Sequence, residues 1–274
     1  MPSGKKSKQM RRAALTAPPP VQSKGGPRRR QASPRALAIG GAVVVVAAVG
    51  IGLALALSGG SGTNGIPKNV QNFTSFANAL PGAKDVNSLF KGIPQTGFKL
   101  GSPLAPVQMI EYIDLQCPIC QLFETTVMTD IIPKYVRTGK VRVEVRPWAF
   151  IGPDSFRGQA AMLAAAKQNK AFDFAQVLYD NQGTENTGWL SNGMVYQAAA
   201  SIPGLNVAQL LSERGSSTVK AEAANVAAQA LADKVTGTPT VLVGKNGTKP
   251  QTVPLKNGGD EPTLVTALDT ALAG

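Results

Sequence analysis

Residues 107–120 read Val-Gln-Met-Ile-Glu-Tyr-Ile-Asp-Leu-Gln-Cys-Pro-Ile-Cys, and this stretch decides the fold. Its first half, Val107 to Ile113, is a mostly apolar run suited to a strand that is buried on both faces. A helix is expected to follow from about Pro118 to Tyr135, because proline is tolerated in a first helical turn, where its missing N–H has no partner to lose. We therefore predict a buried strand that leads into a helix with two thiols at its start.

These two thiols, Cys117 and Cys120, are the only cysteines among the 274 residues, and the chain contains no histidine. The absence of histidine excludes Ser/His and Cys/His catalytic pairs, His-based zinc sites and c-type haem attachment. Positions i and i+3 of a helix lie side by side, so the two thiols can meet. The pattern indicates redox chemistry at this pair.

Cys117 lies just before the first helical turn, where unpaired N–H groups and a partial positive charge favour an anion. We predict that Cys117 is the nucleophile and that Cys120, one turn further in, is the resolving thiol of a redox disulfide Cys117–Cys120. A purely structural disulfide would close too small a loop to stabilise the chain much. A zinc site needs about four ligands, which the chain does not supply. Neither a metal nor another cofactor is expected.

Glu111 interrupts the apolar strand six positions before Cys117. A buried carboxylate is costly, so its presence there suggests a function as proton acceptor or donor for Cys120 during exchange. The alternative is an edge position that faces water. Asp114, at the end of the strand, is expected to face solvent or to cap a turn.

The pattern outside the motif predicts an α/β domain that carries a helical insertion. The long alanine-rich stretches of the insertion are interrupted by glycine and proline, which divides them into four or five helices. The other expected elements are a short edge strand over Gln95–Leu100, the helix over Pro118–Tyr135 that Pro133 kinks or ends, a strand over Val141–Val145, the insertion from Asp154 to about Val235, strands over Thr240–Val243 and Gln251–Leu255, and a helix over Pro262–Leu272.

The formal charge of +12 belongs to the N-terminus. Residues 1–35 carry ten of the 28 Lys and Arg residues and no acid, and the other 18 basic residues nearly balance the 16 acidic ones. Ala36 to Leu57 then runs 22 residues without a charge, enough for a helix of roughly 33 Å that crosses a bilayer. Because the basic flank precedes this span, we expect a cytoplasmic N-terminus and an extracytoplasmic domain.

The predicted organisation is a disordered basic tail (1–35), a transmembrane helix (36–57), a linker (58–92) and a domain (93–274) with its insertion at about 154–235. A cleavable signal peptide is the alternative to an anchor, since Ala54-Leu55-Ala56 resembles a cleavage site, but its apolar core should be shorter. A nucleic-acid role for the tail is also less favoured than contact with anionic lipid, because a membrane span follows at once.

Several motifs together resemble the DsbA-like thioredoxin-fold thiol-disulfide oxidoreductases, membrane-anchored Gram-positive members above all. They cover roughly residues 95–273 and are more specific than two cysteines alone. The stretches that carry the resemblance are Glu111 to Cys120, Gly237-Thr-Pro239-Thr before the next strand, Gly101-Ser-Pro-Leu-Ala-Pro106-Val, Gly152-Pro-Asp-Ser-Phe-Arg157, and Asn181-Gln-Gly-Thr-Glu-Asn-Thr-Gly-Trp189-Leu.

The resemblance implies a thioredoxin fold, with the redox pair at Cys117 and Cys120 and the buried acid at Glu111. It places the family's cis-proline at Pro239, preceded by Thr238, although sequence physics alone favours a trans bond there. Thr238 and Pro239, with Pro118 and Ile119 between the cysteines, would bind substrate. Ile119 replaces a histidine of the best-known members, so it adds no charge that would stabilise the Cys117 thiolate.

The implied activity is the introduction of disulfides into exported proteins, whose thiols are the substrates. The implied recycling partner is a quinone-linked membrane oxidase of the DsbB or vitamin K epoxide reductase-like type. A reductase or isomerase of the same fold, and a non-catalytic binding or chaperone module, are the alternatives. The resting state of the cysteine pair distinguishes an oxidase from a reductase.

Overall fold

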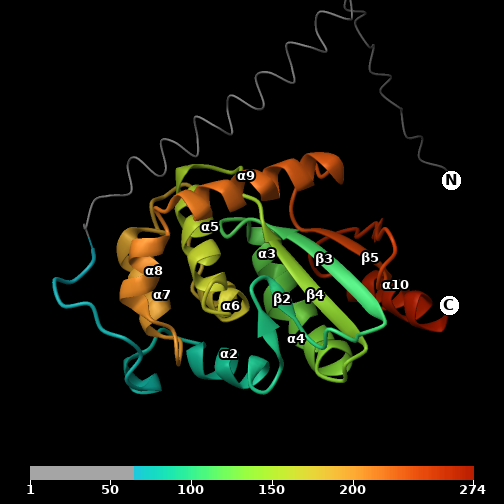
Figure 1. The fold of residues 1–274 in the computed structure, drawn as a ribbon, viewed down its shortest axis with the longest axis horizontal. Helices are drawn as coiled ribbons and strands as arrows, with labels where there is room; N and C mark the ends of the chain where they lie inside the picture. Colours follow the sequence, from blue (N-terminus) through green and yellow to red (C-terminus); the bar gives the residue numbers. More distant parts are fainter. Residues whose placement is uncertain (1–64) are drawn as a thin grey trace, which may run out of the picture. The chain divides into compact units, whose positions relative to one another are not determined.

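The computed structural model of the chain describes residues 65–274, which form a six-stranded mixed sheet with helices packed on it (Figure 1). The strand order is β1-β2-β4-β3-β5-β6, so β3 and β4 lie at the centre. β3 runs parallel to β4 and antiparallel to β5. The strands are β1 (Gln95–Thr96), β2 (Lys99–Leu100), β3 (Val107–Ile113), β4 (Val141–Pro147), β5 (Thr240–Lys245) and β6 (Gln251–Thr252).

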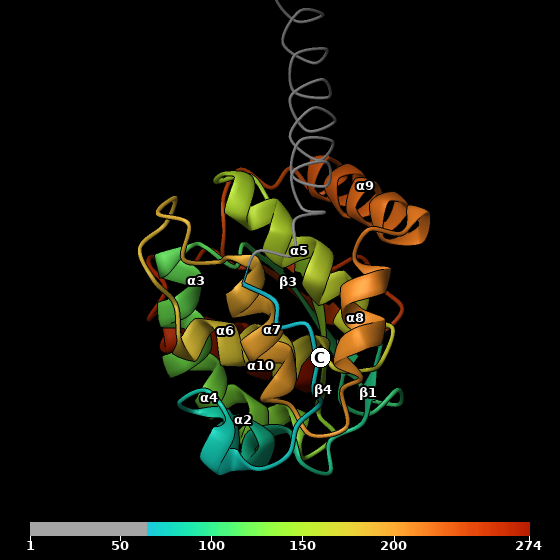
Figure 2. The same cartoon turned by 90° about the vertical axis from the view of Figure 1, so that its left-hand side faces the viewer.

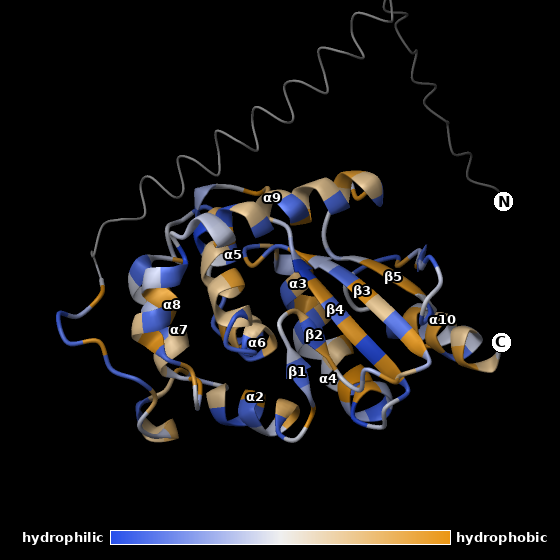
Figure 3. Cartoon of the chain, viewed as in Figure 1, coloured by the Kyte–Doolittle hydropathy of each residue, from blue (hydrophilic) through white to orange (hydrophobic). Residues whose placement is uncertain are grey.

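Strand β3 has the bounds and the burial that its mostly apolar sequence predicts, whereas apolar and polar residues alternate along β4 (Figure 3). Side chains alternate along a strand, so its odd and even residues enter different layers. Val107, Met109 and Ile113 join the main core, together with the helix that follows β3. Ile110 and Tyr112 contact a smaller cluster on the other face, which includes Ala230 of helix α9 (Ser217–Ala232).

The helix that carries the cysteines runs from Pro118 to Val136, close to the predicted end at Tyr135. Its four consecutive segments are α3 (Pro118–Leu122), the π-helical η3 (Phe123–Val127), α4 (Met128–Ile131) and the π-helical η4 (Ile132–Val136). Pro133 lies within η4 rather than ending the helix before it. A π-helical turn pairs residues five apart, as in the bond of 2.8 Å from the Arg137 N–H to the Ile132 carbonyl, so the hydrogen bonds are rearranged around the proline.

Five helices are inserted between β4 and β5, in agreement with the predicted insertion. α5, α6, α7 and α8 contact one another beside the sheet, and α9 packs against α5 and β4 (Figure 2). The inserted helices are α5 (Pro153–Ala166), α6 (Ala171–Asp180), α7 (Asn192–Ala200), α8 (Val207–Glu213) and α9. The last helix of the chain, α10 (Glu261–Ala273), packs on β5 and β3.

Part of the predicted linker belongs to the folded domain. Helix α2 (Ala83–Phe90), preceded by the short 3-10 helix η2 (Phe76–Asn78), packs on α6 within the range 58–92. Its apolar side chains recur at helical spacing, and Ala83, Val86 and Phe90 are buried in the main core. The mixed composition of residues 68–92 was compatible with a helix but did not define its bounds.

Two strand predictions were too long. The edge strand expected over Gln95–Leu100 is a hairpin of β1 and β2, because Gly97 adopts a positive φ of 58° and reverses the chain. The strand expected over Gln251–Leu255 is limited to β6. Within residues 65–274 no helix is long and apolar enough to cross a membrane. The predicted basic tail and the span over 36–57 lie outside the described residues.

Candidate active site

Cys117 and Cys120 lie where β3 leads into α3, as the sequence predicts. Cys117 is the N-cap residue of α3, and its Sγ accepts a hydrogen bond of 3.4 Å from the Cys120 N–H. The Cys117 thiol also donates a hydrogen bond of 3.3 Å to the carbonyl oxygen of Thr238. Cys117 is 6% exposed and Cys120 is 0% exposed, so only the first sulfur is within reach of another molecule.

The contacts around Cys117 favour its thiolate. The hydrogen bond with the Cys120 thiol is the largest influence, and together with the side chain of Thr238 and the N–H groups of Cys120 and Ile119 it lowers the pKa of Cys117 from 9.0 to about 6. Burial acts in the opposite direction and is outweighed. At pH 7 the thiolate therefore predominates over the thiol by about tenfold.

Cys120 has the opposite environment. Burial raises the pKa of its thiol well above 9.0, and the neighbouring Cys117 raises it further. Cys120 therefore stays protonated at neutral pH while Cys117 ionises. This asymmetry suits an attacking sulfur at Cys117 and a leaving sulfur at Cys120 that needs a proton.

The loop before β5 brings Thr238 and Pro239 to the cysteines from 121 residues away. The Thr238–Pro239 peptide bond is cis, as the family resemblance implies and against the general preference for trans. The Thr240 hydroxyl closes the loop by donating to the Gly237 carbonyl at 2.7 Å. Pro239 is half-buried next to the site, and its role in substrate binding stays a prediction.

The residues between the cysteines are exposed. Pro118 and Ile119 lie at the surface, and Ile119, with 46% exposure, is joined by the exposed Leu122 one turn later. The loop after β6 lies against this turn, since a Cβ on Gly258 would approach the Ile119 carbonyl oxygen to 2.5 Å. The site therefore has a small apolar rim next to the partly accessible Cys117 sulfur.

Buried polar groups hold the turn before Cys117. Asp114 does not face solvent as one prediction had it: it is 1% exposed, and its carboxylate accepts hydrogen bonds from the N–H groups of Gln116, Phe150 and Ile151. The bond to Gln116 is the turn cap that the other prediction expected. Gln182 of the insertion donates to the carbonyls of Leu115 and Cys117 at 3.0 and 3.3 Å, so the insertion braces the same turn.

Glu111 is buried in the central strand and not at a water-facing edge, with 1% exposure. Burial raises the pKa of its carboxyl well above 4.5, and the charge of Glu124 raises it further. Glu124 is a residue that the sequence reasoning missed. It lies in η3, four residues after Cys120, is 7% exposed, and has a pKa raised by burial to about 8. The only sign of Glu124 in the sequence was an acidic residue on the cysteine helix, in addition to Glu111 on the strand.

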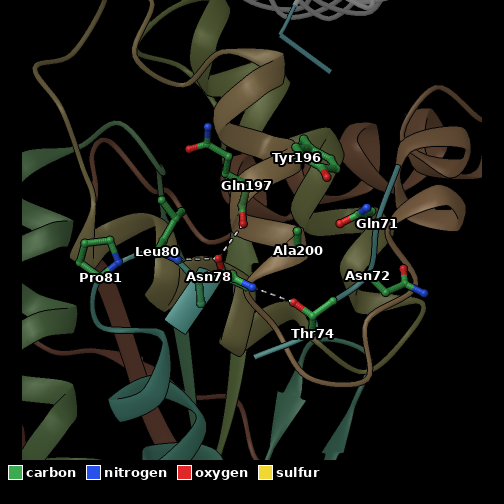
Figure 4. Close-up of a pocket in the computed structure, with 11 residues that line it drawn as sticks. Gln71, Asn72, Thr74, Asn78, Leu80, Pro81, Tyr196, Gln197 and Ala200 are labelled. Atoms are coloured by element: carbon green, nitrogen blue, oxygen red, sulfur yellow. Dashed lines mark hydrogen bonds between the residues drawn. The ribbon is translucent and has the colours of Figure 1, made fainter. Parts of the chain in front are cut away.

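A pocket of about 290 Å³ lies elsewhere, between the segment before α2 and helix α7 (Figure 4). Its lining includes Gln71, Asn72, Tyr196 and Gln197, and hydrogen bonds from Leu80 to Ser201 and from Ser201 to Gln197 tie its wall together. It contains neither a thiol nor a carboxyl group, so it is not the candidate site. Residues 65–274 also hold no cluster of His, Cys, Asp and Glu that could bind a metal ion.

Comparison with known proteins agrees with this geometry. A family model described as thioredoxin matches residues 94–254, more than half of the chain. The chain is 30% identical over 165 residues to the probable disulfide bond formation protein D of Bacillus cereus, covering 59% of this chain and 76% of the relative. Among solved structures it resembles oxidised BdbD from Bacillus subtilis, with a TM-score of 0.58, 21% identity, and coverage of 66% of this chain and 98% of that one.

A crystal structure of Wolbachia pipientis alpha-DsbA1 has the same fold, with a TM-score of 0.52, 25% identity, and coverage of 73% of this chain and 96% of the other. The residues that match the family model cover the sheet, the cysteine turn and the insertion described above. The chain therefore belongs to the thioredoxin family, as a thiol-disulfide oxidoreductase of the DsbA-like type.

Proposed function

We propose that this protein oxidises thiols of exported proteins to disulfides, through Cys117 and Cys120. The observation that carries the proposal is the asymmetry of the two sulfurs: the pKa of Cys117 is lowered to about 6, whereas that of the buried Cys120 is raised. A thiolate that is stabilised in the reduced protein makes the disulfide a stronger oxidant.

The reaction begins when a client thiolate attacks Cys117 of the oxidised pair. The Cys117–Cys120 bond breaks, and its electron pair goes to the Cys120 sulfur, which takes up a proton. A second client thiolate then attacks the client sulfur of the mixed disulfide and releases Cys117 as the stable thiolate. The client is oxidised and the protein is reduced by the same two electrons.

The low pKa of Cys117 does not depend on a neighbouring cation. Pro118 and Ile119 carry no charge, so the stabilisation comes from the hydrogen bonds of Cys120, Thr238 and the backbone rather than from a neighbouring cation. The exposed Ile119 and Leu122 would contact apolar residues of the client, and the backbone at Thr238 and Pro239 would hold the client beside the sulfur.

The proposed location is the outer face of the cell membrane. Residues 1–35 would remain cytoplasmic, residues 36–57 would anchor the chain, and the domain from residue 65 would work outside. A quinone-linked membrane oxidase of the DsbB or vitamin K epoxide reductase-like type would accept the electrons and restore the disulfide. The basic tail followed by an uncharged run supports this topology.

Trapping in intact cells tests the proposal. The full chain with Cys120→Ala should accumulate mixed disulfides between Cys117 and exported proteins, because the resolving thiol is gone. The matched control is the double variant Cys117→Ala/Cys120→Ala, which should trap nothing. Failure of the single variant to trap any exported protein would contradict the proposal.

Alkylation of the unmodified chain in the same cells gives the direction of electron flow. A pair that rests as a disulfide supports an oxidase, whereas a pair that rests as a dithiol identifies a reductase.

Labelling of reduced Cys117 by a thiol reagent that does not cross membranes tests the location. A chain labelled only after lysis would contradict the extracytoplasmic placement.

A further inference from the structure

The pocket between the segment before α2 and helix α7 takes no part in the proposed thiol chemistry (Figure 4). Its volume of about 290 Å³ is near the lower end of the range for small-molecule sites. Eleven residues line it, and none of them carries a charge. A charged ligand would lose water there without finding an opposite charge, so the pocket suits a small, uncharged ligand.

Hydrogen bonds between distant segments hold the walls of this pocket in place. The Leu80 N–H donates to the Ser201 hydroxyl at 2.8 Å, and that hydroxyl donates to the Gln197 carbonyl at 2.7 Å. The Val207 N–H donates to the side-chain oxygen of Asn72 at 2.9 Å. The walls are therefore formed before a ligand arrives, so binding has little ordering of the chain to offset.

Polar side chains around the pocket have unused hydrogen-bonding capacity. The side chains of Gln71, Tyr196 and Gln197 make no hydrogen bond to another residue within residues 65–274. Asn78 donates to the Thr74 hydroxyl at 3.3 Å, which leaves the Asn78 amide oxygen as an acceptor and the Thr74 hydroxyl as a donor. The pocket thus offers a ligand several neutral donors and acceptors.

Apolar groups lie between these polar side chains. Ala79, Pro81 and Ala200 line the same pocket. The ring of the half-buried Tyr196 adds to this apolar surface, and Figure 4 shows Ala200 with Tyr196 above it and Thr74 below it. A matching ligand therefore has C–H surface as well as hydroxyl or amide groups.

A peptide fits this pocket less well than a sugar does. Extended peptides are commonly recognised when their main chain pairs with the edge of a strand. Residues 65–94 contain no strand, and Tyr196 and Gln197 belong to α7, whose main-chain groups pair within the helix. Recognition in the pocket therefore depends on side chains. A sugar ring suits it, because hydroxyls surround ring faces that are made of C–H groups.

We propose that this pocket binds a neutral saccharide of the acetamido-sugar class. The hydroxyl and acetamido groups of the sugar would pair with the free amides of Gln71 and Gln197 and with the Tyr196 hydroxyl. A C–H face of the ring would lie on Ala200. Binding of this kind is a function separate from thiol–disulfide exchange, because the pocket contains no thiol.

The glycan of the cell envelope is the proposed source of the saccharide, and this part of the inference rests on the proposed location. Gln71 follows Leu57, the last residue of the predicted span, by 14 residues. Even fully extended, such a segment reaches at most about 50 Å, so the pocket stays near the membrane surface. A bound glycan would hold the domain where exported chains emerge.

Titration calorimetry of the full chain with chitotriose, a neutral chain of N-acetylglucosamine, tests the proposal. The protein is held in lipid nanodiscs without glycolipids, because sugar-headed detergents would compete for the pocket. Acetyl-trialanine amide, an uncharged peptide, is titrated in parallel. Chitotriose should bind at millimolar concentrations and the peptide should not. No binding of chitotriose, or equal affinity for the peptide, would overturn the proposal.

Variants locate the binding. Gln197→Ala and Tyr196→Phe should each weaken chitotriose binding by about twofold to tenfold, the range for one lost hydrogen bond. Tyr196→Phe keeps the ring that packs against the core, so the fold is preserved. Gln209→Ala is the matched control, because Gln209 is an exposed glutamine on the neighbouring helix α8. Unchanged affinity in both pocket variants, or an equal loss in the control, would show that the sugar does not bind in this pocket.

The rate at which dithiothreitol reduces the oxidised chain separates this proposal from the proposed function. Gln197→Ala and the unmodified chain should be reduced at the same rate, because the pocket holds neither cysteine. A chain that exchanges disulfides but ignores chitotriose would refute the saccharide site alone. A chain that binds chitotriose but does not exchange would support this site and refute the oxidoreductase function.

Discussion

The thiol of Cys117 donates a hydrogen bond of 3.3 Å to the carbonyl oxygen of Thr238, a residue that lies 121 positions later in the chain. This contact joins the start of the cysteine helix to the loop before β5. It also places the backbone that would bind a client next to the sulfur that the client would attack. The backbone proposed to bind clients and the reactive sulfur are therefore in direct contact.

The pH dependence of alkylation should reveal the low pKa of Cys117. The rate of reaction of the reduced protein with iodoacetamide should rise to a plateau with a midpoint near pH 6, because the thiolate is the reactive form. Cys117→Ser should abolish fast alkylation, since Cys120 is buried and its pKa is raised. A midpoint near pH 8.5, the value of an ordinary free cysteine, would contradict the hydrogen-bond account of this site.

Gly258→Ala should destabilise the protein and slow exchange. Its Cβ would come within 2.5 Å of the Ile119 carbonyl oxygen, so either the loop or the cysteine turn has to move. Overpacking of this kind costs about 1–3 kcal/mol in the free energy of unfolding. Gly259→Ala is the matched control, because its Cβ would meet no atom closer than 3.4 Å. Chemical denaturation should give a lower free energy of unfolding for Gly258→Ala than for Gly259→Ala, and its exchange with dithiothreitol should be slower. Equal stability and equal rates in the two variants would show that the close approach at Gly258 has no consequence.

The stability of the protein should fall at high pH because of Glu124. Its carboxyl has a pKa raised from 4.5 to about 8, so the stability that its neutral form contributes is complete below pH 4.5 and is lost as the pH rises through 8. The side chain in Glu124→Gln cannot ionise. Between pH 5 and pH 9 the free energy of unfolding of this variant should therefore fall by at least about 1 kcal/mol less than that of the unmodified chain. The exposed Glu185→Gln should follow the unmodified chain in urea denaturation. Parallel pH profiles for all three proteins would refute a raised pKa at Glu124.

Tyr112→Phe should reduce stability without changing exchange. The Tyr112 hydroxyl donates to Asp233 at 2.7 Å and accepts from Arg146 at 2.6 Å, on the face of the sheet opposite the cysteines. Loss of the hydroxyl should cost about 1–2 kcal/mol, since Arg146 and Asp233 still pair with each other at 2.9 Å. Thermal unfolding and the dithiothreitol rate should therefore respond differently. A slowed exchange would mean that the two faces of the sheet are coupled.

The helices and strands that depend mainly on their own residues could be predicted from the sequence. β3 was predicted with its observed bounds because an apolar run of seven residues fits a strand buried on both faces. The cysteine helix and the five helices of the insertion followed from proline and glycine positions and from alanine content. Of the two alternatives predicted for Pro133, the helix does not end there, because a π-helical turn accommodates the proline.

The site was only partly predictable because its burial is created by distant segments. Glu124 stands among the polar residues Thr125 and Thr126, which is the pattern of a solvent face. Its burial, like that of Tyr179, depends on α6 of the insertion packing against η3. The solvent-facing alternative for Asp114 was wrong for the same reason, since its partners Phe150 and Ile151 belong to the segment after β4, whereas the predicted turn cap is present.

The distance in sequence between Cys117 and Thr238 also sets an order of events during synthesis. The ribosome adds Thr238 only after 120 intervening residues, so a growing chain exposes its cysteines before the side chain of Thr238, which helps to lower the pKa of Cys117, has been made. Strand β5 and the loop before it arrive after the whole insertion. A half-made chain therefore lacks one of the contacts that lower the pKa of Cys117, and this sulfur reaches its full acidity only when the chain is complete.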